Sequence, residues 1–410
     1  MKRVAVLGGG ITGVTTAYAL VQRGVDVTLI ERHRYAAMET SYANGGQLSA
    51  SHAEVWNHKA TILNALKWMA RRDAPLLLHP WPSWHKLSWF AEFLAAMPDY
   101  ERNTIATARM AIAAREHLFA WAAQENIDFD HRRAGILHVY RDQRGFERAA
   151  GVSRLLAQGG LQRRTVTPQE MRAIEPALAG DFYGGYFTDS DSTGDIHKFT
   201  AGLADACARR GVACRYGTQV KALAREQGKL RVSMDDDSTV FDAVVICAGT
   251  ASRAMAAMLG EHVNVYPVKG YSITVQLDDA ASREAAPKVS LLDDATKLVS
   301  SRLGVDRLRV AGTVEFNGVN HDIRADRIRP LLQWVEQCFP GVNTRKVIPW
   351  AGLRPMLPAM LPKVGPGKAP GVYYNTGHGH LGWTLAAATA EMVATMVSKA
   401  VAASSSATNR

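Results

Sequence analysis

The order of apolar and polar positions at the start of the chain predicts a strand, a helix and a second strand. Residues 2–7 form a short apolar run that suits a buried parallel strand, and residues 25–30 form another. Between them, residues 14–23 carry small and apolar side chains at helical spacing. This pattern is typical of the first unit of a parallel α/β fold.

The turn between the first strand and the helix has the glycine spacing of a dinucleotide-binding loop. Gly8, Gly10 and Gly13 form a G-x-G-x-x-G directly after the strand. The first glycine permits the tight turn, the second lets the backbone approach a pyrophosphate, and the third lets the helix pack closely on the strand. Glu31 follows the second strand, where an acid would accept hydrogen bonds from ribose hydroxyls.

The stretch after Glu31 favours FAD over a nicotinamide cofactor. A nicotinamide dehydrogenase would continue with another strand and helix at this point. Residues 39–48 form instead a polar, glycine-containing loop. A loop of this kind is suited to follow an extended ligand, and FAD is such a ligand.

Later segments indicate that the nucleotide-binding domain is interrupted. Residues 243–247 form an apolar strand that enters a glycine turn, which is typical of a central parallel sheet. Residues 263–277 and 297–316 are rich in strand signals and suit an antiparallel sheet. Residues 376–384 form a second glycine-rich loop that opens a helix, where N–H groups can stabilise an anion.

We therefore predict an α/β protein with a discontinuous Rossmann-like FAD-binding domain. Its second domain is an α+β substrate domain, built on a mixed, mainly antiparallel sheet. The predicted FAD-binding segments are 1–50, 190–260 and 345–410, and the substrate domain takes 51–189 and 261–344. Two domains agree with the length of 410 residues.

No secretory signal is expected at the N-terminus, and no membrane-spanning helix is expected elsewhere. The last apolar stretch is interrupted by Glu391 and Lys399 before it reaches the roughly 18 residues that a span needs. The four cysteines form no C-x-x-C pair, so a reducing, intracellular setting is the simplest interpretation.

Residues 56–100 combine aromatic and basic side chains. The members are Trp56, Trp68, Trp81, Trp84 and Trp89, interleaved with Lys59, Lys67, Arg71, Arg72 and Lys86. Two interpretations stay open: an aromatic lid packed on its own domain, or an element that contacts a membrane surface. The net charge of +10 agrees with an anionic partner, which includes an acidic membrane, a phosphate-bearing ligand and nucleic acid.

Four motifs together resemble the FAD-dependent D-amino acid dehydrogenase small subunit, within the superfamily of D-amino acid oxidase, glycine oxidase and sarcosine oxidase. The motifs are residues 8–13, 39–47, 266–272, and 352–355 with 375–384. They spread over nearly the whole chain. The resemblance implies non-covalent FAD and oxidative deamination of D-amino acids to 2-oxo acids and ammonia, with hydride transfer from Cα to flavin N5.

The resemblance also implies a partner and a place. Electrons would pass to a quinone or another respiratory-chain acceptor rather than to oxygen. The protein would be cytoplasmic, or peripheral at the cytoplasmic face of the bacterial inner membrane. One alternative is an amine oxidase acting on glycine, sarcosine or D-hydroxyproline. Another is a basic flavoprotein that binds RNA, although no nucleic-acid partner is expected from the motifs.

Three residues are predicted to bind substrate. The resemblance assigns Arg354 to the substrate carboxylate, and a guanidinium suits bidentate carboxylate binding. Tyr271 is a candidate for the same carboxylate or else a packed strand tyrosine, and His52 is the third. Met360 stands where the family has a glycine, so it is expected near the pocket, favouring uncharged D-amino acids or a cyclic amine.

The remaining predicted site residues bind the cofactor. They are Gly8, Gly10, Ile11, Thr12, Gly13, Glu31, Arg32, Thr40, Ser41, Asn44, Gly45, Gly46, Gln47, Leu48, Val220, Ala248, Gly249, Gly352, Arg354, Gly379, His380, Leu381, Gly382, Trp383 and Thr384. His378 and His380 are further candidates for a positive charge beside the flavin. No metal and no acid–base residue is expected, because the flavin takes the hydride itself.

Overall fold

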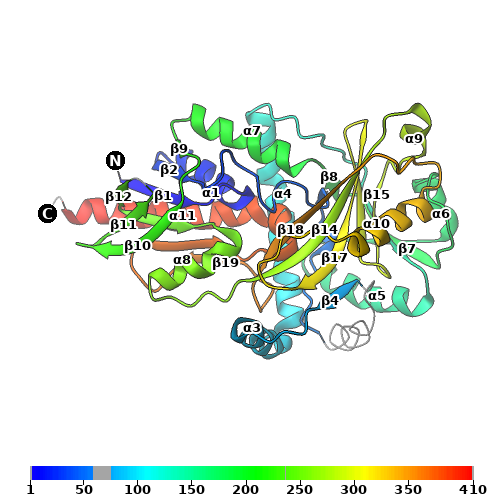
Figure 1. The fold of residues 1–410 in the computed structure, drawn as a ribbon, viewed down its shortest axis with the longest axis horizontal. Coiled ribbons are helices and arrows are strands. Elements are labelled where there is room, and N and C mark those ends of the chain that lie inside the picture. Colours follow the sequence, from blue (N-terminus) through cyan, green and yellow to red (C-terminus); the bar gives the residue numbers. More distant parts are fainter. Residues whose placement is uncertain (1, 59–74, 236, 409–410) are drawn as a thin grey trace.

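The protein is built on two large β-sheets that lie end to end (Figure 1). The structure is a computed structural model, and it describes residues 2–58, 75–235 and 237–408. One sheet has six strands and lies near both chain termini, and the other has nine strands and forms the far end of the molecule (Figure 1).

The six-stranded sheet collects strands from distant parts of the chain. Its order is β19 (Lys363–Pro366), β20 (Val372–Thr376), β13 (Ala243–Ile246), β1 (Arg3–Leu7), β2 (Asp26–Ile30) and β9 (Ala213–Arg215). All neighbours are parallel except β19, which runs antiparallel to β20. The predicted discontinuous Rossmann-like sheet is therefore confirmed.

Layers on both faces bury the six-stranded sheet. In β1, Val4 and Val6 belong to the core on one face, whereas Ala5 and Leu7 belong to the core on the other. The first face is covered by α1 (Ile11–Val21), α4 (Tyr100–Gln124), α7 (Ile196–Arg209) and α11 (Gly382–Thr408). The second is covered by α8 (Ser252–Met258) and the meander β10 (Val220–Glu226), β11 (Lys229–Met234) and β12 (Ser238–Phe241). Burial on both faces explains why these strands are continuously apolar.

The nine-stranded sheet is mixed and mainly antiparallel, as predicted. Its path is β18 (Val347–Met356), β14 (Tyr266–Gln276), β17 (Arg307–Phe316), β16 (Leu298–Leu303), β15 (Ser290–Asp293), β5 (Ile136–Tyr140), β7 (Gly184–Thr188) and β6 (Arg164–Val166), with β4 (Leu76–Leu78) beside β17. The parallel pairs are β15 with β5 and β17 with β4. Helix α10 (Ala325–Cys338) packs on one face, and the other face looks onto the six-stranded sheet's loops.

The remaining elements are short or lie at the edges. They are α3 (Trp84–Ala95), α5 (Gln143–Gln158), α6 (Pro168–Ile174), α9 (Ala280–Ala285), β3 (Gln47–Leu48), β8 (Ser192–Thr193) and the 3-10 turns η1 (Ala50–His52), η2 (Met97–Asp99), η3 (Gly249–Ala251) and η4 (Gly379–Leu381).

Two elements pack with the other domain than the one to which the predicted ranges assign them. Strand β18 pairs with β14 in the nine-stranded sheet, although it lies within the predicted FAD-binding range 345–410. Helix α4 lies in the predicted substrate range 51–189, yet it packs on α11. The exact domain boundaries therefore stay a prediction.

Among the described residues, the helix at Gly379–Ala402 is long and apolar enough to cross a membrane by length and composition, although none was expected. Half of its most apolar window is buried inside the protein. Glu391 in this helix also pairs with Arg23 at 2.5 Å. These contacts are those of a core helix that packs on α1 and α4.

We predict that Gly13→Ala destabilises the protein, because an added Cβ would run into the carbonyl oxygen of Gly8. Relieving that overlap requires a backbone shift, which typically costs about 1–3 kcal/mol. Gly151→Ala is the matched helical control, since its Cβ would meet nothing closer than Arg154 at 3.8 Å. The control should gain up to about 1 kcal/mol from helix propensity. Urea unfolding of both variants tests this, and equal midpoints would contradict it.

Candidate active site

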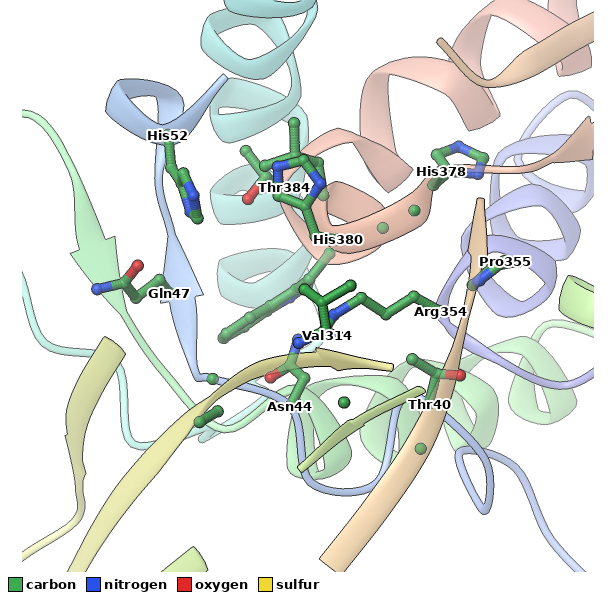
Figure 2. Close-up of a pocket in the computed structure, with 18 of the residues that line it drawn as sticks. Thr40, Asn44, Gln47, His52, Val314, Arg354, Pro355, His378, His380 and Thr384 are labelled. Carbon is green, nitrogen blue, oxygen red and sulfur yellow. The ribbon is translucent and has the colours of Figure 1, made fainter. Parts of the chain in front are cut away.

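One large cavity lies between the two sheets, at the carboxyl ends of the parallel strands. Its volume is about 1210 Å³, and loops after β1, β2, β13 and β20 line it. Ligands of open α/β sheets bind at this edge, because the loops there are free to diverge. The close-up in Figure 2 shows side chains from the nine-stranded sheet, such as Val314 and Arg354, and from the two loops that contain Asn44 and His380, which converge on this space.

The glycine loop after β1 forms one end of the cavity. Gly8 has φ +110°, a left-handed conformation that favours glycine, and Gly13 of α1 lies directly under its carbonyl. The Glu31 carboxylate accepts hydrogen bonds from the main-chain N–H of Gly9 at 2.5 Å and of His33 at 2.8 Å. These bonds fix the acid beside the start of α1, where a nucleotide with ribose and phosphate groups would fit.

The loop at residues 39–48 lies between the cavity and the nine-stranded sheet. The Thr40 hydroxyl donates to the Leu353 carbonyl at 2.8 Å, and the Ser272 hydroxyl donates to the Ala43 carbonyl at 2.7 Å. A Cβ on Gly45 would lie 2.6 Å from Val299, so this loop needs glycine to approach the sheet. The loop is thereby held as one wall of the cavity, which leaves room for an extended ligand.

The second glycine-rich loop joins β20 to α11, and its histidines are uncharged. His378 shares a 2.9 Å hydrogen bond with the Thr389 hydroxyl, and burial lowers its pKa to about 3. Burial and the neighbouring His52 and Arg354 hold the pKa of His380 well below its usual range. The expectation of a positive histidine charge beside the flavin is therefore wrong, because both rings lie where a second charge is poorly solvated.

Arg354 is a buried cation whose guanidinium reaches into the cavity from β18 (Figure 2). The guanidinium lies over Gly270, where any Cβ would overlap it. Nη1 donates to the Thr313 carbonyl at 3.0 Å, and no carboxylate of the described residues forms an ion pair with it. Burial lowers its pKa to about 10, so the group stays charged at neutral pH.

A cluster of uncharged rings borders the same space. The ring of His52 lies 5.1 Å from that of His380, and Trp56 stacks on His380 at 4.7 Å. His138 of β5 lies 6.4 Å from His52 and shares a 2.8 Å hydrogen bond with Ser51. Burial and the positive charges of Lys297 and Arg354 lower the pKa of His52 to about 4.

Tyr271 borders the cavity, but its side chain points to the opposite face of the sheet. Its hydroxyl donates to the Glu315 carboxylate at 2.9 Å, and its ring belongs to the core under α10. Successive strand residues alternate between faces, so Gly270 and Ser272 face the cavity instead. The predicted contact between Tyr271 and a substrate carboxylate is therefore wrong, and the packed-tyrosine alternative holds.

Met360 and Trp89 also differ from expectation. Met360 packs in a core cluster with Val55 and Trp89 and is not among the residues that border the cavity. The Trp89 indole N–H donates to the Met356 carbonyl at 2.9 Å, and the side chain is 2% exposed. Met360 therefore gives no information on substrate preference. Trp89 is buried, so it is not available to contact a membrane.

The structure brings most of the predicted residues together. Those that border the cavity are Gly8, Gly10, Ile11, Thr12, Glu31, Arg32, Thr40, Ser41, Asn44, Gly45, Gln47, His52, Val220, Ala248, Gly249, Gly352, Arg354, Gly379, His380, Leu381, Gly382, Trp383 and Thr384. Gly13, Gly46 and Leu48 lie behind this layer: Gly13 under the first turn, Gly46 against Ser301 and Leu48 in the core.

Sequence reasoning missed several cavity residues on the larger sheet. They are His138, Tyr140, Arg163, Lys297, Thr313, Val314 and Trp350. Two of these had a usable signal: His138 and Tyr140 are two residues apart in a strand and so share a face. The others depend on strand pairing across the sheet. The described residues contain no group of three or more metal-ligating side chains.

Comparisons with known proteins agree with this geometry. A family model described as FAD dependent oxidoreductase matches residues 3–396. D-amino acid dehydrogenase 3 of Mesorhizobium japonicum is 60% identical over 400 residues, which cover 97% of each chain. The D-amino acid dehydrogenase of Paramagnetospirillum magneticum is 40% identical over 97% of this chain and 95% of its own.

Solved structures share the fold at low identity. Glycine oxidase from Geobacillus kaustophilus superposes with a TM-score of 0.75 at 20% identity, covering 97% of this chain and 95% of its own. L-proline dehydrogenase from P. horikoshii gives a TM-score of 0.76 at 17% identity, covering 97% and 93%. The chain therefore belongs to the FAD-dependent oxidoreductase family, together with the bacterial D-amino acid dehydrogenases that it matches over nearly its whole length.

Proposed function

We propose that this enzyme oxidises D-amino acids at Cα with non-covalently bound FAD and passes the electrons to a quinone or another non-oxygen acceptor. The imino acid so formed hydrolyses to a 2-oxo acid and ammonia. Relatives with 60% and 40% identity carry the name D-amino acid dehydrogenase. The observation that carries the proposal is Arg354, a buried cation in the family's cofactor cavity with no described carboxylate partner.

The loops that border the cavity would hold FAD. Gly8, Gly10 and the first turn of α1 suit the pyrophosphate, and Glu31 suits a ribose. The loops at residues 39–48 and 376–384 would enclose the flavin, with N–H groups at the start of α11 beside it. Bound FAD supplies an acceptor for the hydride that leaves Cα.

Arg354 would orient the substrate through its carboxylate. A guanidinium offers two parallel donors to a carboxylate, so it fixes both position and rotation of the α-carbon. The contact with Thr313 uses only one of its N–H groups at close range, which leaves donors for a ligand. An unpaired buried charge is unfavourable, so pairing the Arg354 guanidinium with a substrate carboxylate would also favour binding.

The charge around the site favours an uncharged substrate amine, which hydride transfer requires. Burial first, and then the positive charges of Lys297 and Arg354, depress the pKa of His52, and the same surroundings oppose a positive ammonium. The three histidines near the site stay uncharged, because burial keeps the pKa values of His52, His138 and His380 low. Substrate would therefore lose its amine proton more readily here than in water.

An amine oxidase acting on glycine, sarcosine or D-hydroxyproline remains the alternative. These substrates also carry a carboxylate, so Arg354 would serve them equally well. The choice between the two functions depends on stereochemistry and on the electron acceptor.

We also propose that helix α3 contacts the cytoplasmic face of the bacterial inner membrane. Trp84, Leu87 and Leu94 follow one another at spacings of three and seven residues, which places them on one side of this helix, and they are 81%, 53% and 50% exposed. Trp81, just before the helix, is 75% exposed. Exposed tryptophans beside leucines are typical of elements that enter a lipid interface.

Two parts of the aromatic and basic segment lie in different surroundings, which supports a separate role for each. Trp56 and Leu76 border the cavity, as a lid would, whereas Trp81 and Trp84 face solvent. Lys86 is not available to lipid, because its Nζ donates to the carbonyls of His79 and Trp81. Lys59, Lys67, Trp68, Arg71 and Arg72 lie outside the described residues. A membrane contact here would bring the cavity close to a lipid-soluble quinone.

A panel of amino acids with an artificial electron acceptor tests the proposed activity. We expect D-alanine, D-proline and D-hydroxyproline to bleach the flavin under anaerobic conditions, and oxygen alone to support a much slower turnover. Bleaching by L-isomers or glycine only would contradict the D-amino acid assignment. Peroxide release in air at the rate of the dye-linked assay would favour the oxidase.

We predict that Arg354→Ala raises KM for a D-amino acid by about 10- to 100-fold, since charge-assisted hydrogen bonds contribute about 1.5–3 kcal/mol. The absorption spectrum should show that FAD stays bound. Arg354→Lys should recover part of the loss, because it restores the charge but not the paired donors. An unchanged KM in Arg354→Ala would remove the carboxylate role.

Vesicles that contain anionic phospholipid test the membrane contact. We expect the full-length protein to sediment with them, less at high salt, and less still after joint replacement of Trp81 and Trp84 by alanine. Tyr183→Ala is the control, since Tyr183 is 47% exposed elsewhere on the molecule. If the unmodified protein never sediments with the vesicles, α3 contacts no membrane.

A further inference from the structure

The cavity that holds Arg354 and the histidines has a part that borders helix α5. We call this space the α5 lobe. Tyr140, Ala149, Val152, Leu155, Arg163 and Lys297 border it, and it is continuous with the cavity that holds Arg354. Along α5 its wall combines apolar side chains with Arg148, Arg154 and Gln158, and at the inner end β5 brings Tyr140 and His138 to the same face.

Tyr140 presents an unused hydrogen-bond donor to the α5 lobe. The side chain is 4% exposed, and its ring packs edge-on against Phe146 and Tyr186 at 6.0 and 5.8 Å. The side chain borders the cavity, and its hydroxyl makes no hydrogen bond to any described residue. A hydroxyl that borders a cavity and has no protein partner is free to bind a ligand or water there.

Arg163 presents a second donor at the same end. Its Nε and Nη2 donate to Ser153 at 3.2 and 2.7 Å, which fixes the plane of the guanidinium. Nη1 has only a 3.5 Å contact with His138, which is too long for a strong hydrogen bond. The guanidinium lies 4.9 Å from the centre of the Tyr186 ring, and no described carboxylate forms an ion pair with it.

Lys297 and Glu54, which also border the cavity, have partners, whereas the exposed Arg148 and Arg154 of α5 have no carboxylate partner among the described residues. Lys297 pairs with Asp294 at 2.5 Å. Glu54 accepts from the Tyr100 hydroxyl at 2.6 Å and pairs with His58 at 3.4 Å. The unused groups at the inner end are therefore donors, and a ligand that fits them must bring an acceptor oxygen.

His52 connects the two ends of this space. Its ring lies 5.1 Å from that of His380 on one side and 6.4 Å from that of His138 on the other, and Arg163 Nη1 lies 3.5 Å from the His138 ring. A substrate held by its α-carboxylate at Arg354 would thus direct its side chain past His52 toward Tyr140 and Arg163.

We propose that the α5 lobe binds the side chain of the substrate through a carboxylate or carboxamide oxygen that accepts from Tyr140 and Arg163. This inference rests on the proposed function and specifies its substrate class: D-glutamate and D-glutamine rather than aliphatic or cationic D-amino acids of similar length. A site built to hydrogen-bond a polar group discriminates strongly against an analogue that lacks it, since its own donors are then left unpaired.

The test compares kcat/KM for D-glutamate, D-glutamine, D-norleucine and D-lysine with an artificial electron acceptor. We expect D-glutamate or D-glutamine to exceed D-norleucine by at least about tenfold. Tyr140→Phe should lower that ratio by about tenfold, and Arg163→Met should lower it further for D-glutamate than for D-glutamine. Tyr183→Phe is the control, because Tyr183 does not border the cavity.

Binding of unreactive analogues gives a readout without turnover. Titration calorimetry should show that glutarate binds the holoenzyme more tightly than pentanoate, and that Tyr140→Phe removes the difference. Circular dichroism of each variant checks that it folds.

The outcomes separate the two proposals. If no D-amino acid reduces the flavin, the proposed function fails. If D-alanine or D-norleucine is oxidised but neither polar substrate is preferred, or if D-lysine is preferred, the side-chain assignment is wrong while the function stands. An unchanged ratio in Tyr140→Phe also overturns the assignment.

Discussion

A cation buried between two sheets is the constraint around which the active site is arranged. The Arg354 guanidinium donates to main-chain carbonyls of neighbouring strands, and no carboxylate of the described residues pairs with it. This position requires a residue without a side chain beneath the guanidinium, and Gly270 is that residue. Gly352 in turn leaves room for the Trp350 ring. Burial is the main reason why His52 and His380 are uncharged, and the nearby positive charge of Arg354 lowers their pKa values further.

Much of this architecture could be predicted from the sequence. The glycine loop, the acid at Glu31 and the second glycine loop each have a local signature, because backbone geometry and helix ends dictate their residues. The apolar strand at residues 243–247 showed that the parallel sheet resumes late in the chain. These features depend on neighbours in sequence or on burial on both faces of a sheet.

The predictions that failed concerned the direction and burial of a side chain rather than the segment in which it lies. Tyr271 was placed in the correct strand, but the alternation of faces turns its hydroxyl to Glu315. Met360 follows Arg354 closely in the sequence, yet its side chain packs into the core with Trp89. His378 and His380 lie in the predicted loop, but their burial keeps them uncharged. Tertiary packing determines the direction, the burial and the protonation state of a side chain, and the sequence of a single segment does not reveal them. Arg163 and Lys297 reach the cavity only through pairings across the nine-stranded sheet.

The order of strands in the six-stranded sheet has a consequence for synthesis. Strand β1 pairs with β13, and β13 pairs with β20 at Val372–Thr376, so the centre of the sheet is incomplete until nearly the whole chain exists. Contacts this distant in sequence form slowly, and apolar strand edges stay open in the meantime. The N-terminal strand and its glycine loop therefore leave the ribosome long before the partners that bury them. A chain truncated before β20 would expose those edges, which makes aggregation of nascent or shortened chains the chief hazard of this fold.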